Sequence, residues 1–417
     1  MKKNIKRLVS LVFALITAIS FASVYAGCGS GDNGSGNGDG GNNPKPTPAE
    51  PKTTVALSET DYVKFSGRVY DRGDDEFLIF NTASGFKFKT DSKNVSVTLE
   101  SLVTGTSGSA YMGVYVDGKR VSLPEKTEDR DRLELKSGKS EYVIYKDGDG
   151  ISHEIEILKL TEAQYSTVTA YSVEGDGKFY PLKATNKAKM VFFGDSITCG
   201  YGNVDEASFM EYRTSGQDGL KTYAFMTARE LGFDIDVFAA SGWAINKASW
   251  HKTDMKIPQV FRQYSPTFNL DGELYLNEPD ESVKIVVINL GTNDYTYFEG
   301  APSDLKSRKE AFSYQYREFV KQVRKFYPNG KIVLCFGMMD WNGNMVSTMD
   351  ECIKRDVATE LKEKYLLLHT ASGSEDMGAN GHPSVKAQQK ACEDLVKYIK
   401  ERQNYASGDS NEWTPDL

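Results

Sequence analysis

Four short blocks of the sequence hold residue types that acyl transfer uses. They are Gly194-Asp195-Ser196-Ile197-Thr198, Ser241-Gly242-Trp243, Gly291-Thr292-Asn293-Asp294 and His382-Pro383. A serine hydroxyl becomes a nucleophile when a base takes its proton, and the developing oxyanion then needs hydrogen-bond donors. Each block alone can be structural, since Gly-Asp-Ser is a common turn and His-Pro can open a helix. Their joint occurrence favours a catalytic site.

The segments between the blocks predict the sheet that would bring them together. Short apolar runs have the length of buried strands: KMVFFG, DIDVFAAS, VKIVVINLG, KIVLCFG and YLLLH. Helical patterns separate these runs at 221–231, 305–326, 347–364 and 385–402. Strands that alternate with helices predict a parallel sheet, whose ligands bind at the carboxyl ends of the strands. The four blocks lie where such a sheet has its carboxyl-edge loops.

A different pattern precedes this region. Residues 54–180 consist of short alternating apolar runs separated by turn residues, which predicts a β-sandwich. In the run from Ile151 to Ile157, the alternation places His153 on the side of the isoleucines, so we expect a packed core histidine. The fold class is therefore α/β, with a parallel-sheet domain over 185–403 preceded by a β-sandwich domain over 54–180.

In this order the four blocks resemble the SGNH (GDSL) hydrolase superfamily, whose parallel sheet is flavodoxin-like. They do not fit the GxSxG elbow of α/β-hydrolases, because Thr198 stands where that motif has glycine. The resemblance implies that Ser196 is the nucleophile and His382 its base. It also implies an oxyanion hole made by the backbone amides of Ser196 and Gly242 with the Asn293 side chain.

One position departs from the superfamily pattern. Members commonly carry an aspartate two or three residues before the histidine, where this chain has Asn380 and Ala379. Three groups are candidates for orienting the imidazole: a backbone carbonyl, the Asn380 side chain, and Asp376 from earlier in the loop. The first two would make a Ser-His dyad. His369, at the end of a predicted strand, is the alternative base.

A β-sandwich placed before GDSITCGYG resembles carbohydrate esterase family 2 over most of the mature chain. That resemblance implies a jelly-roll-like sandwich beside the hydrolase domain, and removal of acetyl groups from plant polysaccharides such as xylan and glucomannan. Pyranose rings offer apolar faces to aromatic side chains, so we expect substrate contacts from Trp243, Tyr295 and Trp341. Core packing is the alternative for Trp243.

Other functions are open from the residues alone. The SGNH scaffold also serves lysophospholipases, although the polar, tyrosine-rich loops favour short acyl groups. Peptidoglycan O-deacetylation is chemically close, and the missing aspartate suggests a surface carbohydrate-binding protein with a decayed esterase site. A net charge of −8 without a basic stripe argues against nucleic-acid partners. We expect a monomer that acts on acetylated polysaccharide or oligosaccharide.

The N-terminus predicts export. A basic start and the run LVSLVFALITAIS predict a signal peptide over 1–27, and Tyr25-Ala26-Gly27-Cys28 resembles a lipobox in which Cys28 is lipidated. Ordinary signal peptidase cleavage, giving a secreted protein, is the alternative. Residues 28–53 are predicted to be a flexible tether and 404–417 an extension. The membrane is expected as a partner only through the lipid anchor.

The remaining cysteines predict no special chemistry. With Cys28 assigned to the anchor, four of the five cysteines remain, and none has CxxC spacing. Cys335 lies within the run KIVLCFG and should be a buried strand residue. We therefore expect no disulfide framework, no metal site and no cofactor.

Overall fold

The computed structural model describes residues 49–103, 108–124, 131–183, 187–249, 255–300, 302–340 and 342–402. The predicted signal peptide, Cys28, Trp341 and the extension 404–417 lie outside these residues, as does the predicted tether up to residue 48. Within the described ranges, no helix has the length and apolar character needed to cross a membrane.

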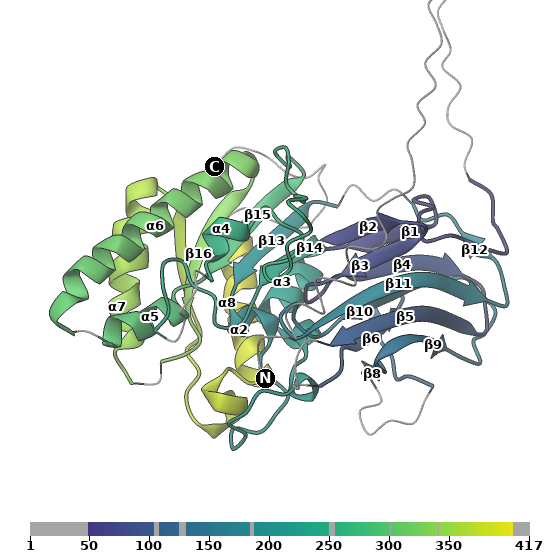
Figure 1. Ribbon diagram of the computed structural model, residues 1–417, viewed down its shortest axis with the longest axis horizontal. Coiled ribbons are helices and arrows are strands. Elements are labelled where there is room, and N and C mark those ends of the chain that lie inside the picture. Colours follow the sequence, from purple (N-terminus) through teal and green to yellow (C-terminus); the bar gives the residue numbers. More distant parts are fainter. Residues whose placement is uncertain are drawn as a thin grey trace, which may run out of the picture. The chain divides into compact units, whose positions relative to one another are not determined.

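Two antiparallel sheets form the N-terminal part of the described chain (Figure 1). One sheet has the order β1-β4-β10-β6-β7, with β12 beside β4 and β8 beside β6, and the other has the order β2-β3-β11-β5-β9. The strands are β1 Val63–Ser66, β2 Val69–Gly73, β3 Glu76–Ile79, β4 Gly85–Thr90, β5 Val95–Val103, β6 Tyr111–Val116, β7 Lys119–Arg120, β8 Leu133–Glu134, β9 Gly138–Tyr145, β10 His153–Lys159, β11 Ser166–Gly175 and β12 Phe179–Tyr180.

Hydrophobic side chains fill the space between the two sheets. In β5, buried and partly exposed residues alternate, as expected when one face of a strand meets a core. In β10, Ile155 and Ile157 face the sandwich core, whereas Leu158 packs in the hydrophobic cluster of the C-terminal part. Alternation therefore identified the sandwich core, and the second buried face of β10 results from packing between the two parts.

His153 is not in the core position that the alternation predicted. It is the first residue of β10, with Nδ1 2.6 Å from Asp117 Oδ2 and Nε2 3.0 Å from Asp149 Oδ1. Hydrogen bonds to these two carboxylates raise the pKa of His153 above its usual value. The prediction of a packed core histidine is wrong, because the strand only begins at this residue and neighbouring turns supply charged partners.

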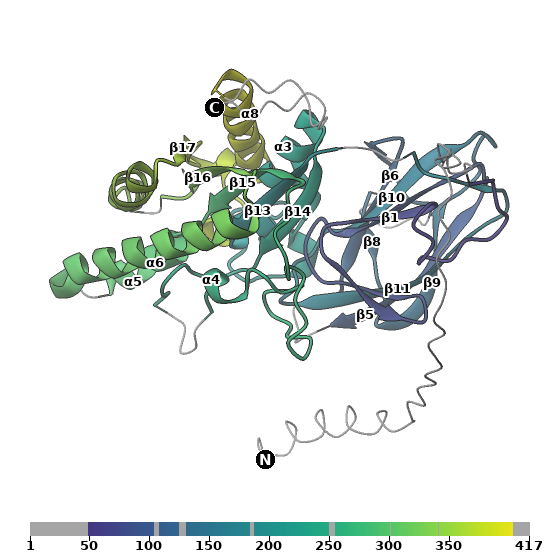
Figure 2. The ribbon, with the colours of Figure 1, turned by 90° about the horizontal axis from the view of Figure 1, so that it is seen from above.

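A parallel sheet in the order β14-β13-β15-β16-β17 forms the C-terminal part, with helices on both faces (Figures 1 and 2). Its strands are β13 Lys189–Gly194, β14 Asp234–Ala239, β15 Val283–Asn289, β16 Lys331–Gly337 and β17 Lys364–Leu368. Its helices are α2 Ser196–Cys199, α3 Tyr223–Leu231, α4 Ile257–Val260, α5 Thr292–Glu299, α6 Leu305–Phe326, α7 Met345–Asp350 and α8 Val385–Arg402. α3 packs against α8 on one face, and α6 lies on the other. The predicted parallel α/β sheet preceded by a β-sandwich is confirmed.

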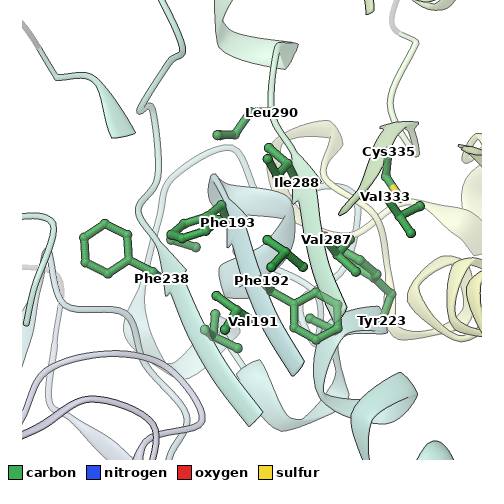
Figure 3. Close-up of a cluster of buried hydrophobic side chains, with 14 of the residues drawn as sticks. Val191, Phe192, Phe193, Tyr223, Phe238, Val287, Ile288, Leu290, Val333 and Cys335 are labelled. Carbon is green, nitrogen blue, oxygen red and sulfur yellow. The ribbon is translucent and has the colours of Figure 1, made fainter. Parts of the chain in front are cut away.

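The centre of the parallel sheet explains the continuous apolar runs of the sequence. Val191, Phe192 and Phe193 are consecutive residues of β13, and all three are fully buried (Figure 3). A strand covered by helices on both faces has no polar side to present. Cys335 is buried in β16, as its run predicted, and packs near Val333 in the same view.

Two of the predicted helices agree with the structure, and the other two differ at their ends. The ranges 305–326 and 385–402 are α6 and α8. α3 begins at Tyr223 because Thr222 is its N-cap and accepts a hydrogen bond from the Phe225 N–H. The predicted helix 347–364 ends earlier, after α7 and a π-helical segment Glu351–Thr359, because Lys362 has a φ of 58° and Lys364 already pairs in β17.

Buried polar contacts join the sandwich to the parallel sheet. Arg68, between β1 and β2, donates from Nε to Asp236 Oδ2 of edge strand β14 at 2.9 Å and from Nη1 to the Phe261 carbonyl oxygen at 2.6 Å. Asn81 Nδ2 donates to the Tyr264 carbonyl oxygen at 2.8 Å. Such buried groups need well-placed partners to offset their lost hydration, so these contacts define one position for the sandwich against β14.

Candidate active site

The loops that follow β13, β14 and β15 border a cavity of about 500 Å³. Ser196, Gly242 and Asn293 each follow one of these strands, and His382 reaches the cavity from the loop before α8. The residues of all four sequence blocks thus meet at the carboxyl edge of the sheet. The lining consists of Gln164, Tyr165, Ser196, Tyr201, Ser241, Gly242, Thr292, Asn293, Thr296, Met339, Asn380 and His382.

Ser196 and His382 are in hydrogen-bond contact. Ser196 Oγ lies 2.8 Å from His382 Nε2, and Nδ1 of the same ring lies 3.3 Å from the backbone carbonyl oxygen of Asn380. A carbonyl oxygen can only accept, so Nδ1 carries the proton and Nε2 accepts the Ser196 hydroxyl. This arrangement is the one that a serine nucleophile and its base require.

A backbone oxygen stands where superfamily members commonly have a carboxylate. Asn380 has a φ of 52°, in the left-handed region that asparagine enters more readily than most residues, and its N–H donates to the Phe209 carbonyl oxygen at 2.7 Å. This conformation presents the Asn380 carbonyl to the imidazole of His382. Among the three candidates for orienting His382, the geometry matches the backbone carbonyl.

Asp376, the acidic candidate, contacts a different histidine. Its Oδ2 lies 2.9 Å from His369 Nε2, and its two oxygens lie 2.9 and 3.0 Å from Lys390 Nζ. Burial raises the pKa of Asp376, but the hydrogen bonds from Lys390 and His369 outweigh burial and bring it to about 2. Asp376, one of the three candidates, therefore does not orient His382, and His369 does not line the cavity as an alternative base would.

A column of tyrosines supports the other side of His382. The rings of Tyr201 and His382 are stacked, with centroids 4.1 Å apart and an interplanar angle of 25°. Tyr212 packs on Tyr201 at 4.7 Å, and Tyr165 of the sandwich stacks on Tyr212 at 4.1 Å. This column was not predicted from the sequence. Tyr201 was visible in GDSITCGYG, but nothing in the sequence connects Tyr165 or Tyr212 to the histidine.

The environment of His382 disfavours its charged form. Burial lowers the pKa of His382 to about 4, and hydrogen bonds with the backbone of Asn380 and Ala379 oppose this only in part. In the described structure no carboxylate stabilises an imidazolium through Nδ1, because that atom faces the Asn380 carbonyl oxygen. The base is therefore neutral over a wide pH range.

Gly242 and Asn293 line the cavity beside Ser196. Gly242 has a φ of 81°, so the turn after β14 requires glycine at this point. Asn293 Nδ2 donates to the Trp243 carbonyl oxygen at 2.8 Å and lies 3.3 Å from Asp195 Oδ2. These contacts hold the amide nitrogen of Asn293 between the loops that follow β13 and β14.

Two buried aspartates brace the same loops. Asp294 accepts hydrogen bonds from the backbone N–H groups of residues 245–247 at 2.7 to 3.0 Å, and Asp195 accepts from the Ile197 N–H at 3.0 Å. Burial raises the pKa of Asp294 to about 6 and that of Asp195 to about 7. Both aspartates belong to the sequence blocks, and both organise backbone around the cavity.

Two of the aromatic residues chosen from the sequence, Trp243 and Tyr295, do not line the cavity. Trp243 is 7% exposed and Tyr295 is 5% exposed, and both pack in the hydrophobic cluster of the parallel-sheet domain. The prediction that these rings contact substrate is wrong, because the loops after the strands fold back and bury them. Trp341 lies outside the described residues. Among the described residues, the aromatic side chains that line the cavity besides His382 are Tyr165 and Tyr201.

Known proteins are similar to this chain in sequence and in fold. Residues 192–396 match the GDSL-like Lipase/Acylhydrolase family model, a span that contains all four blocks. The chain is 25% identical over 335 residues to the cellulase/esterase CelE of Acetivibrio thermocellus, a match covering 78% of this chain but only 38% of that protein. It is 24% identical over 277 residues to an acetylxylan esterase/glucomannan deacetylase of Cellvibrio japonicus, covering 64% of this chain and 74% of that protein.

A solved structure shows the same pairing of a sandwich with a parallel-sheet domain. A family two carbohydrate esterase from Clostridium thermocellum, in complex with cellohexaose, superimposes with a TM-score of 0.70 at 23% identity. The superposition covers 82% of this chain and 100% of that one. Residues 192–396 are thus similar to the GDSL-like lipase/acylhydrolase family, and the fold of the chain is that of the family two carbohydrate esterases.

Proposed function

We propose that this chain is a serine esterase that removes O-acetyl groups from plant cell-wall polysaccharide. The observation that carries the proposal is the 2.8 Å contact between Ser196 Oγ and His382 Nε2 at a cavity of about 500 Å³. Ser196 would be the nucleophile and His382 its base. The backbone N–H groups of Ser196 and Gly242, with the Asn293 amide, would bind the oxyanion.

In the first half of the reaction, Ser196 Oγ attacks the acetyl carbonyl carbon while its proton passes to His382 Nε2. The carbonyl oxygen becomes an oxyanion and takes hydrogen bonds from the three donors. Asn293 can supply one of these by turning to it the N–H that now faces Asp195 at the longer distance of 3.3 Å. The intermediate then collapses, the sugar oxygen leaves with the proton from His382, and the acetyl group stays on Ser196.

In the second half, water attacks the acetylated serine. His382 Nε2 takes a proton from this water, a second oxyanion forms at the same donors, and the proton returns to Ser196 Oγ as acetate leaves. Throughout, Nδ1 of His382 donates to the Asn380 carbonyl oxygen, which keeps Nε2 directed at the serine. The mechanism is thus that of a Ser-His dyad.

The cavity lining supports a carbohydrate substrate. Tyr165 offers aromatic surface for a pyranose ring, and Gln164 and Asn380 offer amide groups for sugar hydroxyls. The relatives named above include an acetylxylan esterase/glucomannan deacetylase. We propose acetylated xylan and glucomannan as substrates on these two grounds.

The choice of substrate is tested by acetate release from acetylated glucomannan and acetylated xylan, beside a small activated acetyl ester and a long-chain acyl ester. We expect release from at least one polymer and little cleavage of the long-chain ester. Cleavage of the small ester without release from either polymer would keep the chemistry and reject the polysaccharides. If none of the esters is cleaved, a carbohydrate-binding protein with a decayed site becomes the better explanation.

The pH dependence of kcat/KM should reflect the buried base. His382 must be neutral to accept the Ser196 proton, so the activity that depends on this base is lost as the pH falls through its pKa in the folded protein, about 4. We expect the limb of kcat/KM that belongs to His382 to lie near that pH and not near pH ~6.5, where an ordinary histidine would be half protonated. Protonation of Asp294 and Asp195, whose pKa values are about 6 and 7, adds a separate effect at higher pH. Acetate release from a small acetyl ester, after a pre-incubation control at each pH, measures this.

Tyr201 provides the matched variants for that profile. Tyr201→Ala uncovers one face of the imidazole to water, so the acidic limb should move up towards the ordinary histidine value. Tyr201→Phe retains the stacked ring and should keep the wild-type limb. An acidic limb that lies at the same pH in Tyr201→Ala and in the wild type would show that burial by this ring does not control the pKa of His382.

A further inference from the structure

The loop between β10 and β11 of the sandwich enters the parallel-sheet domain beside the active site. It consists of residues 160–165 and supplies Gln164 and Tyr165 to the cavity lining. Glu162, near its middle, has no exposed surface. Burying a carboxylate this completely is costly unless its oxygens are hydrogen-bonded, so its partners indicate what the residue does.

Both carboxylate oxygens of Glu162 bind Ser241. Oε2 accepts a hydrogen bond from the Ser241 backbone N–H at 2.7 Å, and Oε1 accepts one from the Ser241 hydroxyl at 2.6 Å. Ser241 directly precedes Gly242, and the peptide bond between them carries the Gly242 N–H. A residue of the sandwich therefore binds the residue immediately before Gly242, whose N–H is a proposed oxyanion donor.

Asp294 holds the other end of the loop that follows β14 and contains Ser241 and Gly242. This carboxylate binds the backbone N–H groups of residues 245–247. The segment 241–247 is thus held by buried carboxylates at both ends, one from each domain. Gly242, with its φ of 81°, lies between the contacts made by these two carboxylates.

Glu162 is itself held in place. Lys159 Nζ donates to the carbonyl oxygens of Thr161 and Glu162 at 2.6 and 3.1 Å, and the Glu162 N–H donates to Gln217 Oε1 at 3.2 Å. Gln217 Nε2 donates in turn to the carbonyl oxygen of Cys199, the last residue of the helix that Ser196 begins. One buried network therefore reaches both the oxyanion loop and the nucleophile helix.

We propose that Glu162 is a positioning residue, supplied by the β-sandwich, that sets the place of the Gly242 N–H for the oxyanion. The inference rests on the proposed esterase function. Glu162 does not line the cavity and acts through Ser241, so it is not a catalytic residue itself. Burial raises the pKa of Glu162, and the hydrogen bonds from Ser241 and the charge of Lys159 oppose this.

The expected kinetic effect follows from when the oxyanion forms. Donors placed in advance stabilise the transition state, and losing one costs about 10²- to 10³-fold in kcat. Displacing a donor should lower kcat by less than removing it. The ester in its ground state gains little binding from the donor, so KM should change little. A purely structural role would instead lower stability and leave kcat of the folded enzyme unchanged.

Glu162→Ala and Glu162→Gln test the proposal. Alanine removes both contacts with Ser241, and we expect kcat for a small acetyl ester to fall about 10- to 10²-fold with KM within about threefold. Glutamine keeps one acceptor oxygen, so its kcat should lie between alanine and wild type. Concentrations of folded enzyme are set by labelling Ser196 with a fluorophosphonate to completion.

Affinity for methylboronic acid gives a second measurement, because boronates form a tetrahedral adduct with serine that uses the same donors. Its affinity should fall in Glu162→Ala by about the same factor as kcat. The matched control is Asn81→Ala, which removes a buried bond from the sandwich to the Tyr264 carbonyl oxygen away from the cavity. We expect the control to lose some stability and to keep the wild-type kcat and boronate affinity.

The outcomes separate this inference from the proposed function. If the wild type cleaves no acetyl ester, the proposed function fails. If the wild type is active and Glu162→Ala keeps its kcat and boronate affinity, the positioning role is overturned. Should Glu162→Ala fail to fold, Glu162→Gln decides alone: a kcat reduced by about three- to tenfold with boronate affinity lowered supports the proposal, and wild-type values of both overturn it.

Discussion

Ser196→Ala should lower kcat for acetate release by about 10⁴- to 10⁶-fold. The Ser196 hydroxyl is the group that His382 Nε2 contacts at 2.8 Å, and alanine leaves no atom to form the acetyl-enzyme. The remaining rate would come from water activated weakly in the presence of the oxyanion donors. Acetate release from a small acetyl ester and from acetylated polysaccharide measures the loss.

A fluorophosphonate gives an independent test of the same residue. It should label the wild-type chain at Ser196 and leave Ser196→Ala unlabelled. Ser307→Ala is the matched control, because Ser307 is exposed at the start of α6, where its hydroxyl donates to the Asp304 carbonyl oxygen. Full activity in Ser196→Ala would reject the nucleophile assignment.

His382→Ala should lower kcat by on the order of 10⁴- to 10⁶-fold. Without the imidazole, nothing at Nε2 takes the Ser196 proton, and nothing returns it to the leaving sugar oxygen. The Ser196→Ala/His382→Ala double variant should be no slower than the worse single variant, since the two residues act as one unit. These effects are measured as initial rates with a small acetyl ester, at enzyme concentrations high enough to detect the residual activity.

His369→Ala is the matched control for the base. His369 also lies in a loop at the sheet edge, but its Nε2 pairs with Asp376 and it does not line the cavity. We expect its kcat to stay within about twofold of wild type, in contrast to His382→Ala. A large loss in His369→Ala together with a mild one in His382→Ala would exchange the roles assigned to the two histidines.

The groups that orient His382 could not be identified from residue types alone. The missing aspartate suggested a decayed site when only the sequence was considered. In the structure, the Asn380 carbonyl oxygen and the Tyr201 ring contact the imidazole, and the ring keeps its contact with Ser196. The Asn380 carbonyl oxygen carries no full negative charge, so it stabilises a protonated imidazole less than a carboxylate would. This is consistent with the low pKa of His382, which keeps the ring neutral.

The sequence by itself determined the fold class and the four blocks of the candidate site. Periodicity identified the buried strands, since a strand covered on both faces must be apolar throughout and a helix must repeat its apolar face. Ser196, Gly242 and Asn293 could be located because the carboxyl ends of parallel strands meet at one edge. These features depend on residues that are neighbours in the chain.

The tertiary structure alone decided which side chains the blocks meet. Glu162 and Tyr165 come from the sandwich, and their contacts with Ser241 and Tyr212 join segments far apart in the sequence. The direction of a side chain after a strand is also set by packing, which is why Trp243 is buried although it adjoins Gly242. Local patterns carry no record of such contacts, because the contacts depend on how the sandwich and the parallel sheet pack together.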